Sequence, residues 1–71
     1  SYKLISMQIF NRWGQLIYED YQNIGWDGRL RSGVMASPGS YMYIIRIQPM
    51  TVPPSNEEIF KGWLNLIFNK K

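Results

Sequence analysis

The chain has 71 residues, of which 45% are hydrophobic, 15% aromatic and 18% charged. This length accommodates one domain and excludes a two-domain enzyme, and the apolar fraction excludes an intrinsically disordered chain. The sequence contains no Cys and no His, which excludes disulfides, thiolate metal sites and the commonest general base. The net charge of +3 mildly favours anionic partners, but the basic residues are spread along the chain and form no nucleic-acid-binding stripe.

The longest uninterrupted apolar runs are only a few residues long, far below the ~20 residues of a membrane-spanning helix. The N-terminus lacks the pattern of a cleavable signal peptide. We therefore expect no transmembrane segment, and a chain that is soluble or arrives through a partner.

Residues 4–10 alternate in a way that predicts a β-strand, with Ile5, Met7 and Ile9 on one face. Ser6, Gln8 and Phe10 would face the other side, which is the period of a strand.

A turn follows this strand. Residues 11–14 interrupt the alternation and residues 15–19 resume it, which predicts an antiparallel hairpin whose short turn needs a positive φ at Gly14. Residues 20–40 are rich in Gly and Pro, and we expect loops and short strand pieces there.

Residues 41–47 give the clearest strand pattern, because aromatic and β-branched side chains dominate. The side chains expected to share one face are Tyr41, Tyr43, Ile45 and Ile47. Residues 48–56 contain three prolines, which cannot donate ladder hydrogen bonds, and should form a connection.

Residues 59–68 are predicted to form the last strand. An amphipathic helix over residues 57–68 is the alternative, which Gly62 weakens. Four or five strands with many turns predict an all-β fold, a small antiparallel immunoglobulin-like β-sandwich that occupies residues 1–71 as one domain.

Three clusters stand out as motifs. They comprise Asn11, Arg12, Trp13 and Gly14; then Trp26, Asp27 and Gly28; then Pro38, Gly39, Tyr41 and Tyr43. In the second cluster, a buried ring, a carboxylate that accepts backbone N–H bonds and a left-handed glycine would together fix a turn. In the third, Pro sets φ within a turn and Gly supplies a positive φ after it.

In this order, followed by Lys61-Gly62 and an apolar strand, the clusters resemble the gliding-motility-associated C-terminal domain of Bacteroidetes proteins. That family is the type B sorting domain of the type IX secretion system. Its pattern is Phe-Asn-Arg-Trp-Gly, an apolar strand, Trp-Asp-Gly, Pro-x-Gly-x-Tyr or a close variant, a Tyr-rich strand, then Lys-Gly and a final strand. The match spans roughly residues 2–70. Each motif alone is weak evidence for the family. The three clusters followed in order by Lys61-Gly62 are more specific evidence.

The chain departs from this pattern in three places. The family usually carries an Asn-Gly-Asp-Gly-like stretch upstream of the point where this chain begins, so we expect a C-terminal sorting domain that lacks its most N-terminal segment. The spacer between Pro38 and Tyr41 is one residue shorter than the commonest form. The family often ends in a basic residue, and here Lys70 and Lys71 follow the last strand.

The resemblance implies a non-catalytic signal that directs an N-terminal cargo in the same polypeptide across the outer membrane, after transit through the periplasm, to the cell surface or medium. The implied partners are the type IX secretion machinery and, in several family members, an outer-membrane protein of the PorP/SprF type. No cofactor is implied.

The last strand and tail are the expected contact with that machinery. A terminal strand with an unpaired edge can add to a receptor's sheet, where main-chain hydrogen bonds give affinity. The residues expected to bind the partner are Lys61, Gly62, Leu64, Leu66, Phe68, Lys70 and Lys71. The alternative is an ordinary edge strand whose lysines guard against aggregation.

Other interpretations stay open for the aromatic side chains. Trp13 with Arg12 is either a receptor anchor or, as we favour, packed on the sheet, since a small sandwich needs large rings to fill its core. Trp26 is expected in the core. Stacking of Tyr41 and Tyr43 on sugars would make the chain a carbohydrate-binding module, but we favour the core for both rings. A structural immunoglobulin-like module of a surface protein is the alternative function.

The acidic residues do not predict an enzyme. Asp27 has no evident catalytic partner, and its turn role accounts for it. The pairs at residues 19–20 and 57–58 lack the spaced oxygen ligands of a calcium loop. No paired nucleophile and base can be assembled from the remaining residues.

Overall fold

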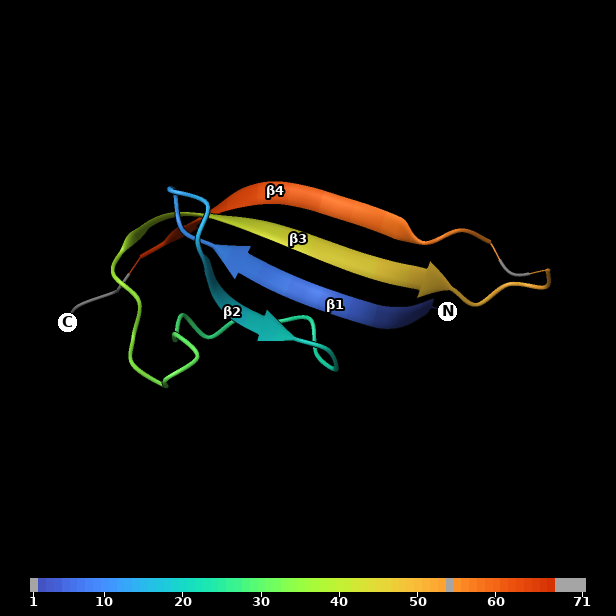
Figure 1. Ribbon diagram of the computed structural model, residues 1–71, viewed down its shortest axis with the longest axis horizontal. Helices are drawn as coiled ribbons and strands as arrows, with labels where there is room; N and C mark the ends of the chain where they lie inside the picture. The colour runs from blue at the N-terminus through green and yellow to red at the C-terminus, as the bar shows by residue number, and fades with distance from the viewer. Residues whose placement is uncertain (1, 54, 68–71) are drawn as a thin grey trace.

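The computed structural model describes residues 2–53 and 55–67. The strands are β1 (Tyr2–Phe10), β2 (Leu16–Asp20), β3 (Gly39–Pro49) and β4 (Glu58–Leu66). They form one antiparallel sheet in the order β2-β1-β3-β4 (Figure 1). The predicted all-β antiparallel class is confirmed. The described residues include no helix long and apolar enough to cross a membrane.

The last described element is a strand. β4 pairs with β3 along its whole length, so the alternative of a helix over residues 57–68 is wrong for the part that the structure describes. Gly62 lies in the middle of this strand, where its low helix propensity has no cost. Phe68, which was predicted to end the strand, lies outside the described residues.

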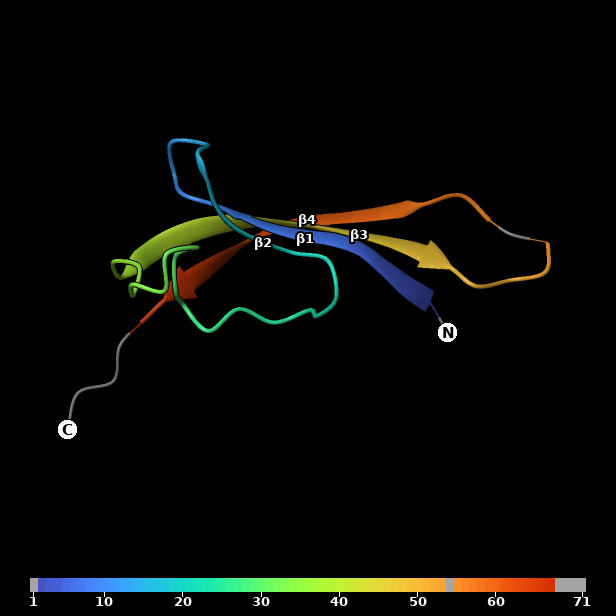
Figure 2. The same cartoon turned by 60° about the horizontal axis from the view of Figure 1, so that its bottom comes forward.

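Residues 21–38 form the second layer of the fold. They cross one face of the sheet as irregular backbone (Figure 2), with a single isolated bridge between Arg29 and Met35. The layers meet in a small core, where Ile9, Ala36 and Tyr41 are 1%, 3% and 8% exposed. The result is a small sandwich-like arrangement in which one layer is a sheet and the other is loop.

The register explains which side chains reach this core. Residues directly opposite each other in an antiparallel pair point to the same face, and Tyr43 lies opposite both Ile9 on β1 and Gly62 on β4. Met7 and Ile9 lie on the covered face as predicted. Ile5 is the extra residue of a bulge and has no partner on β3.

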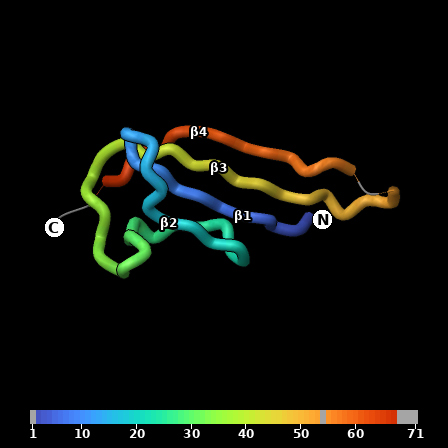
Figure 3. The backbone as a smooth tube through the Cα atoms, viewed as in Figure 1, coloured from blue at the N-terminus to red at the C-terminus, as the bar shows by residue number. Residues whose placement is uncertain are grey.

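The opposite face of the sheet is not covered by residues 21–38 (Figure 2). By register, this open face carries Phe10, Leu16, Met42, Ile44, Ile59 and Trp63. Both connections that contain the motifs gather near the end where β3 starts, whereas the β3–β4 connection lies at the other end (Figure 3). One end of the sheet therefore carries the motifs, and the other end carries the β3–β4 connection.

Candidate functional site

The turn between β1 and β2 is held by the side chain of Asn11. Its Oδ1 accepts the N–H groups of Trp13 at 3.0 Å and Gln15 at 2.9 Å, and its Nδ2 donates to Gln15 Oε1 at 2.7 Å. The predicted positive φ at Gly14 is confirmed at +83°, and its N–H donates to the Asn11 carbonyl at 3.0 Å. The backbone thus depends on Asn and Gly, which leaves the two side chains between them available for contacts.

Those two side chains form a stacked pair at the tip of the turn. The Arg12 Cζ atom lies 4.5 Å from the centroid of the Trp13 ring, a cation–π distance. Trp13 is 71% exposed, so the expectation that it packs on the sheet is wrong. The turn places the ring beyond the last β1–β2 pair, Phe10 and Leu16.

The second motif forms a turn against the core. Trp26 is half-buried, meets Tyr41 edge to face at 5.2 Å between ring centroids, and donates from Nε1 to the Arg29 carbonyl at 2.8 Å. Asp27 Oδ1 accepts the Arg29 N–H at 3.1 Å, and Gly28 has the expected positive φ, +85°. Asp27 is therefore engaged in the turn itself.

The third motif starts β3. Gly39 has the expected positive φ, +149°, and Tyr41 turns its ring into the core, where its hydroxyl donates to the Ser37 carbonyl at 2.5 Å. Tyr43 is half-buried beside the same cluster. The Tyr41 ring is thus enclosed, which leaves little of it to stack on a sugar.

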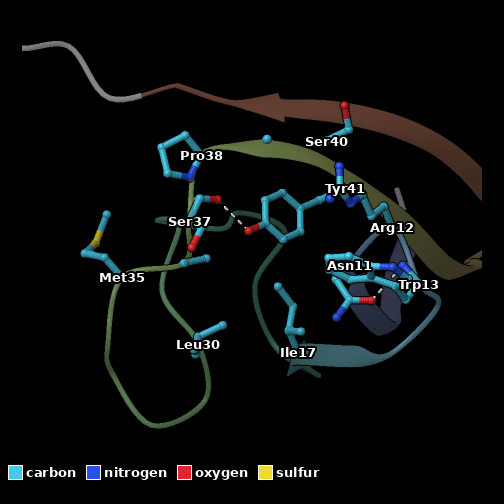
Figure 4. A pocket seen from close by; sticks show the side chains of 12 residues that line it. Asn11, Arg12, Trp13, Ile17, Leu30, Met35, Ser37, Pro38, Ser40 and Tyr41 are labelled. Atoms are coloured by element: carbon cyan, nitrogen blue, oxygen red, sulfur yellow. Dashed lines mark hydrogen bonds between the residues drawn. The ribbon is translucent and has the colours of Figure 1, made fainter.

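The first and third motifs line one groove of about 440 Å³ (Figure 4). One wall is the turn at residues 11–13, the other is the segment at residues 37–41, and Ile17 and Leu30 also line the groove. More than twenty residues separate these walls in the sequence. The fold therefore gathers its motifs at one end of the sheet.

The groove carries one positive charge, that of Arg12. Arg12 is its one charged lining residue, beside the polar residues Asn11, Ser37 and Ser40. The ion pairs found among the described residues join Arg29 to Asp27 and Arg46 to Glu57, at 3.6 and 3.7 Å. Arg12 thus adds a positive charge, with no ion-pair partner among the described residues, to a groove that has both apolar and polar lining residues.

β4 offers an open strand edge. Within the described ranges, its backbone pairs with β3 alone. The other edge strand, β2, is only five residues long, and its Ile17 carbonyl accepts the Arg31 N–H at 3.2 Å. The longer and less protected edge of the sheet is therefore that of β4.

The residues expected to bind a partner through β4 are split between two faces. Lys61 is exposed on the open face, whereas Leu64 and Leu66 pack against the core cluster and Gly62 lies beneath the Tyr43 ring. The tail residues Phe68, Lys70 and Lys71 lie outside the described residues. Side chains of this set could not all contact one partner surface, although the backbone edge could.

Two of the three exposed large apolar residues of β4 lie on the open face and were missed. Trp63 and Ile59 are 63% and 49% exposed, and by register they share the open face with Lys61. The alternation of β4 itself was the available signal, because it separates Ile59, Lys61 and Trp63 from Gly62 and Leu64.

The acidic pair at the end of β2 has structural partners. The Glu19 pKa is lowered chiefly because Gln8 Nε2 donates to its carboxylate at 2.8 Å. The Asp20 pKa is lowered chiefly by the Gln22 N–H, which donates to Oδ1 at 2.9 Å. No group of three or more potential metal-ligating side chains gathers in the part of the chain that the structure describes.

Comparison with known proteins identifies one family. Residues 1–66 match the CHU_C Type IX secretion signal domain. No curated protein and no solved structure matches the chain. The matched range contains all three motifs and all four strands.

Proposed function

The chain belongs to the type IX secretion signal domain family, and on this premise we propose that it directs an attached cargo protein across the outer membrane to the cell surface or medium. The family match over residues 1–66 carries this proposal. The proposal includes passage through the periplasm, a cargo N-terminal to the domain in the same polypeptide, and a partner of the PorP/SprF type.

We propose further that the domain has no catalytic role of its own. Four of its five acidic residues are engaged in structural contacts: Glu19 with Gln8, Asp20 and Asp27 within turns, and Glu57 with Arg46. Any chemistry of the exported protein would then belong to the cargo.

The open edge of β4 supports recognition by strand addition. Nine residues of edge strand can pair with an extended segment of the machinery, with affinity from main-chain hydrogen bonds. The positive charge of Lys61 would orient the approach of an acidic surface. The competing explanation, a lysine that only prevents aggregation, predicts that export is insensitive to changes along this edge.

A transplant experiment tests the function. Residues 1–71 are fused behind a periplasmic reporter in a host that has the type IX pathway, and reporter activity is measured in the medium, on the surface and in the periplasm. We expect export that is lost in a host without the translocation machinery and with the reporter alone. A second, longer fusion that adds an Asn-Gly-Asp-Gly-like stretch ahead of Ser1 is the control for a missing upstream segment. Retention of both fusions in the periplasm would contradict the proposal.

A further inference from the structure

Arg12 is arranged to bind a carboxylate. Its Cζ atom lies over the Trp13 ring, 4.5 Å from the centroid, and the guanidinium carries five N–H donors in one plane. Neither ion pair found among the described residues uses these donors. A planar donor set of this kind suits a bidentate contact with a carboxylate.

Apolar side chains line the groove beside Arg12. Ile17, Leu30, Met35 and the Tyr41 ring line it, and the Tyr41 hydroxyl is already engaged by Ser37. A ligand that offered charge alone would leave the accessible parts of Ile17, Leu30 and Met35 uncovered, and a wholly apolar ligand would leave Arg12 without a counter-charge. The surface therefore selects for both features together.

We propose that this groove binds an extended acidic segment of a partner protein, in which an Asp or Glu pairs with Arg12 and an adjacent large apolar side chain enters the groove. This inference rests on the secretion role proposed above and names the chemistry of the partner. Charge complementarity supports it, since Arg12 is the only charged lining residue and the chain carries a net +3.

The geometry of the turn favours tight contact. Asn11 fixes the backbone that carries both side chains, and the stack with Trp13 already restricts Arg12, so less conformational freedom is lost on binding. Trp and Arg are also the side chains that most often dominate binding energy at protein interfaces.

Export of the reporter fusion tests the inference in the cell. We expect Arg12→Glu to reduce export about tenfold or more, and Arg12→Lys to reduce it less, since Lys keeps the charge but lacks the planar donors. Arg31→Glu is the matched control, because it makes the same change in charge at an exposed residue outside the groove. If the wild type is exported and Arg12→Glu is exported equally well, the inference is wrong while the proposed function stands.

A binding measurement tests the groove independently of export. The 71-residue chain is titrated with the capped peptide Gly-Asp-Phe-Asp-Gly and with its Asn counterpart, and backbone amide shifts are followed by NMR. We expect shifts at residues 11–13 and 37–41, binding about tenfold weaker for the Asn peptide, and weakening in about 1 M salt, where the screening length is about 3 Å. Equal binding of the two peptides, or shifts confined to β4, would overturn the inference.

Discussion

The ring of Tyr43 lies over Gly62 on the neighbouring strand. The two residues are directly opposite in the β3–β4 register, and a Cβ atom at residue 62 would lie 2.6 Å from Tyr43 Cζ, closer than packed carbon atoms approach. The Lys-Gly motif and the Tyr-rich strand are thus two sides of one contact. An aromatic ring across a strand glycine also covers backbone that would otherwise face water.

Gly62→Ala should therefore destabilise the domain by about 1–3 kcal/mol, the usual cost of forcing extra volume into a packed site. Urea unfolding followed by fluorescence measures the change. Lys61→Ala is the adjacent control and should change stability by less than about 0.5 kcal/mol, because Lys61 points to the open face. The cost of Gly62→Ala should largely disappear in a Tyr43→Ala background, and an unchanged cost there would contradict the contact.

Replacing Trp26 should destabilise the domain much more than replacing Trp13. Trp26→Ala removes a ring that packs on Tyr41 and should cost about 3 kcal/mol. Trp13→Ala removes a ring that is 71% exposed and should cost less than about 0.5 kcal/mol. Thermal unfolding of both variants checks this, and a Trp13→Ala variant as unstable as Trp26→Ala would show that the turn tip is packed.

Asn11 should be needed mainly as an acceptor. Asn11→Ala leaves the N–H groups of Trp13 and Gln15 without their acceptor and should cost about 1 kcal/mol. Asn11→Asp keeps the accepting oxygen and loses the donor to Gln15 Oε1, so its cost should be smaller. If the Asp variant is as unstable as the Ala variant in chemical denaturation, the side-chain contact with Gln15 matters more than the acceptor role.

Acid should weaken the end of β2. The folded-state pKa values of Glu19 and Asp20 are lowered, so these carboxylates contribute stability that is present above their ordinary pKa values, near 4, and is lost as pH falls through the lowered values. Unfolding measured from neutral pH down to about pH 2 should show this loss. Asp20→Asn should reduce the slope, and an unchanged profile would contradict the turn contact with Gln22.

Local patterns predicted most of the strands. Alternation located β1 and β2, and the aromatic and β-branched run located β3, because both signals arise from a few neighbouring residues. The glycines at residues 14, 28 and 39 were also predictable, since each follows turn-forming side chains.

Contacts between residues distant in the sequence determine the parts of the structure that local patterns did not predict. The path of residues 21–38 depends on contacts such as that between Trp26 and Tyr41 and the bond from the Arg31 N–H to the Ile17 carbonyl, which no local pattern encodes. The exposure of Trp13 was missed because ring size argues for burial, whereas turn geometry decides the outcome. The groove itself joins residues that are distant in the sequence, so only the folded chain shows it.

The direction of β1 separates cargo from groove. β1 starts with Tyr2 near the end of the sheet where β3 finishes, and runs to the turn of Arg12 and Trp13 at the opposite end of the sheet (Figure 1). A globular protein joined ahead of Tyr2 would begin roughly one strand length from the groove, about 30 Å for nine residues. A cargo at that position should therefore not obstruct the proposed contact at the groove, whatever the size of the cargo.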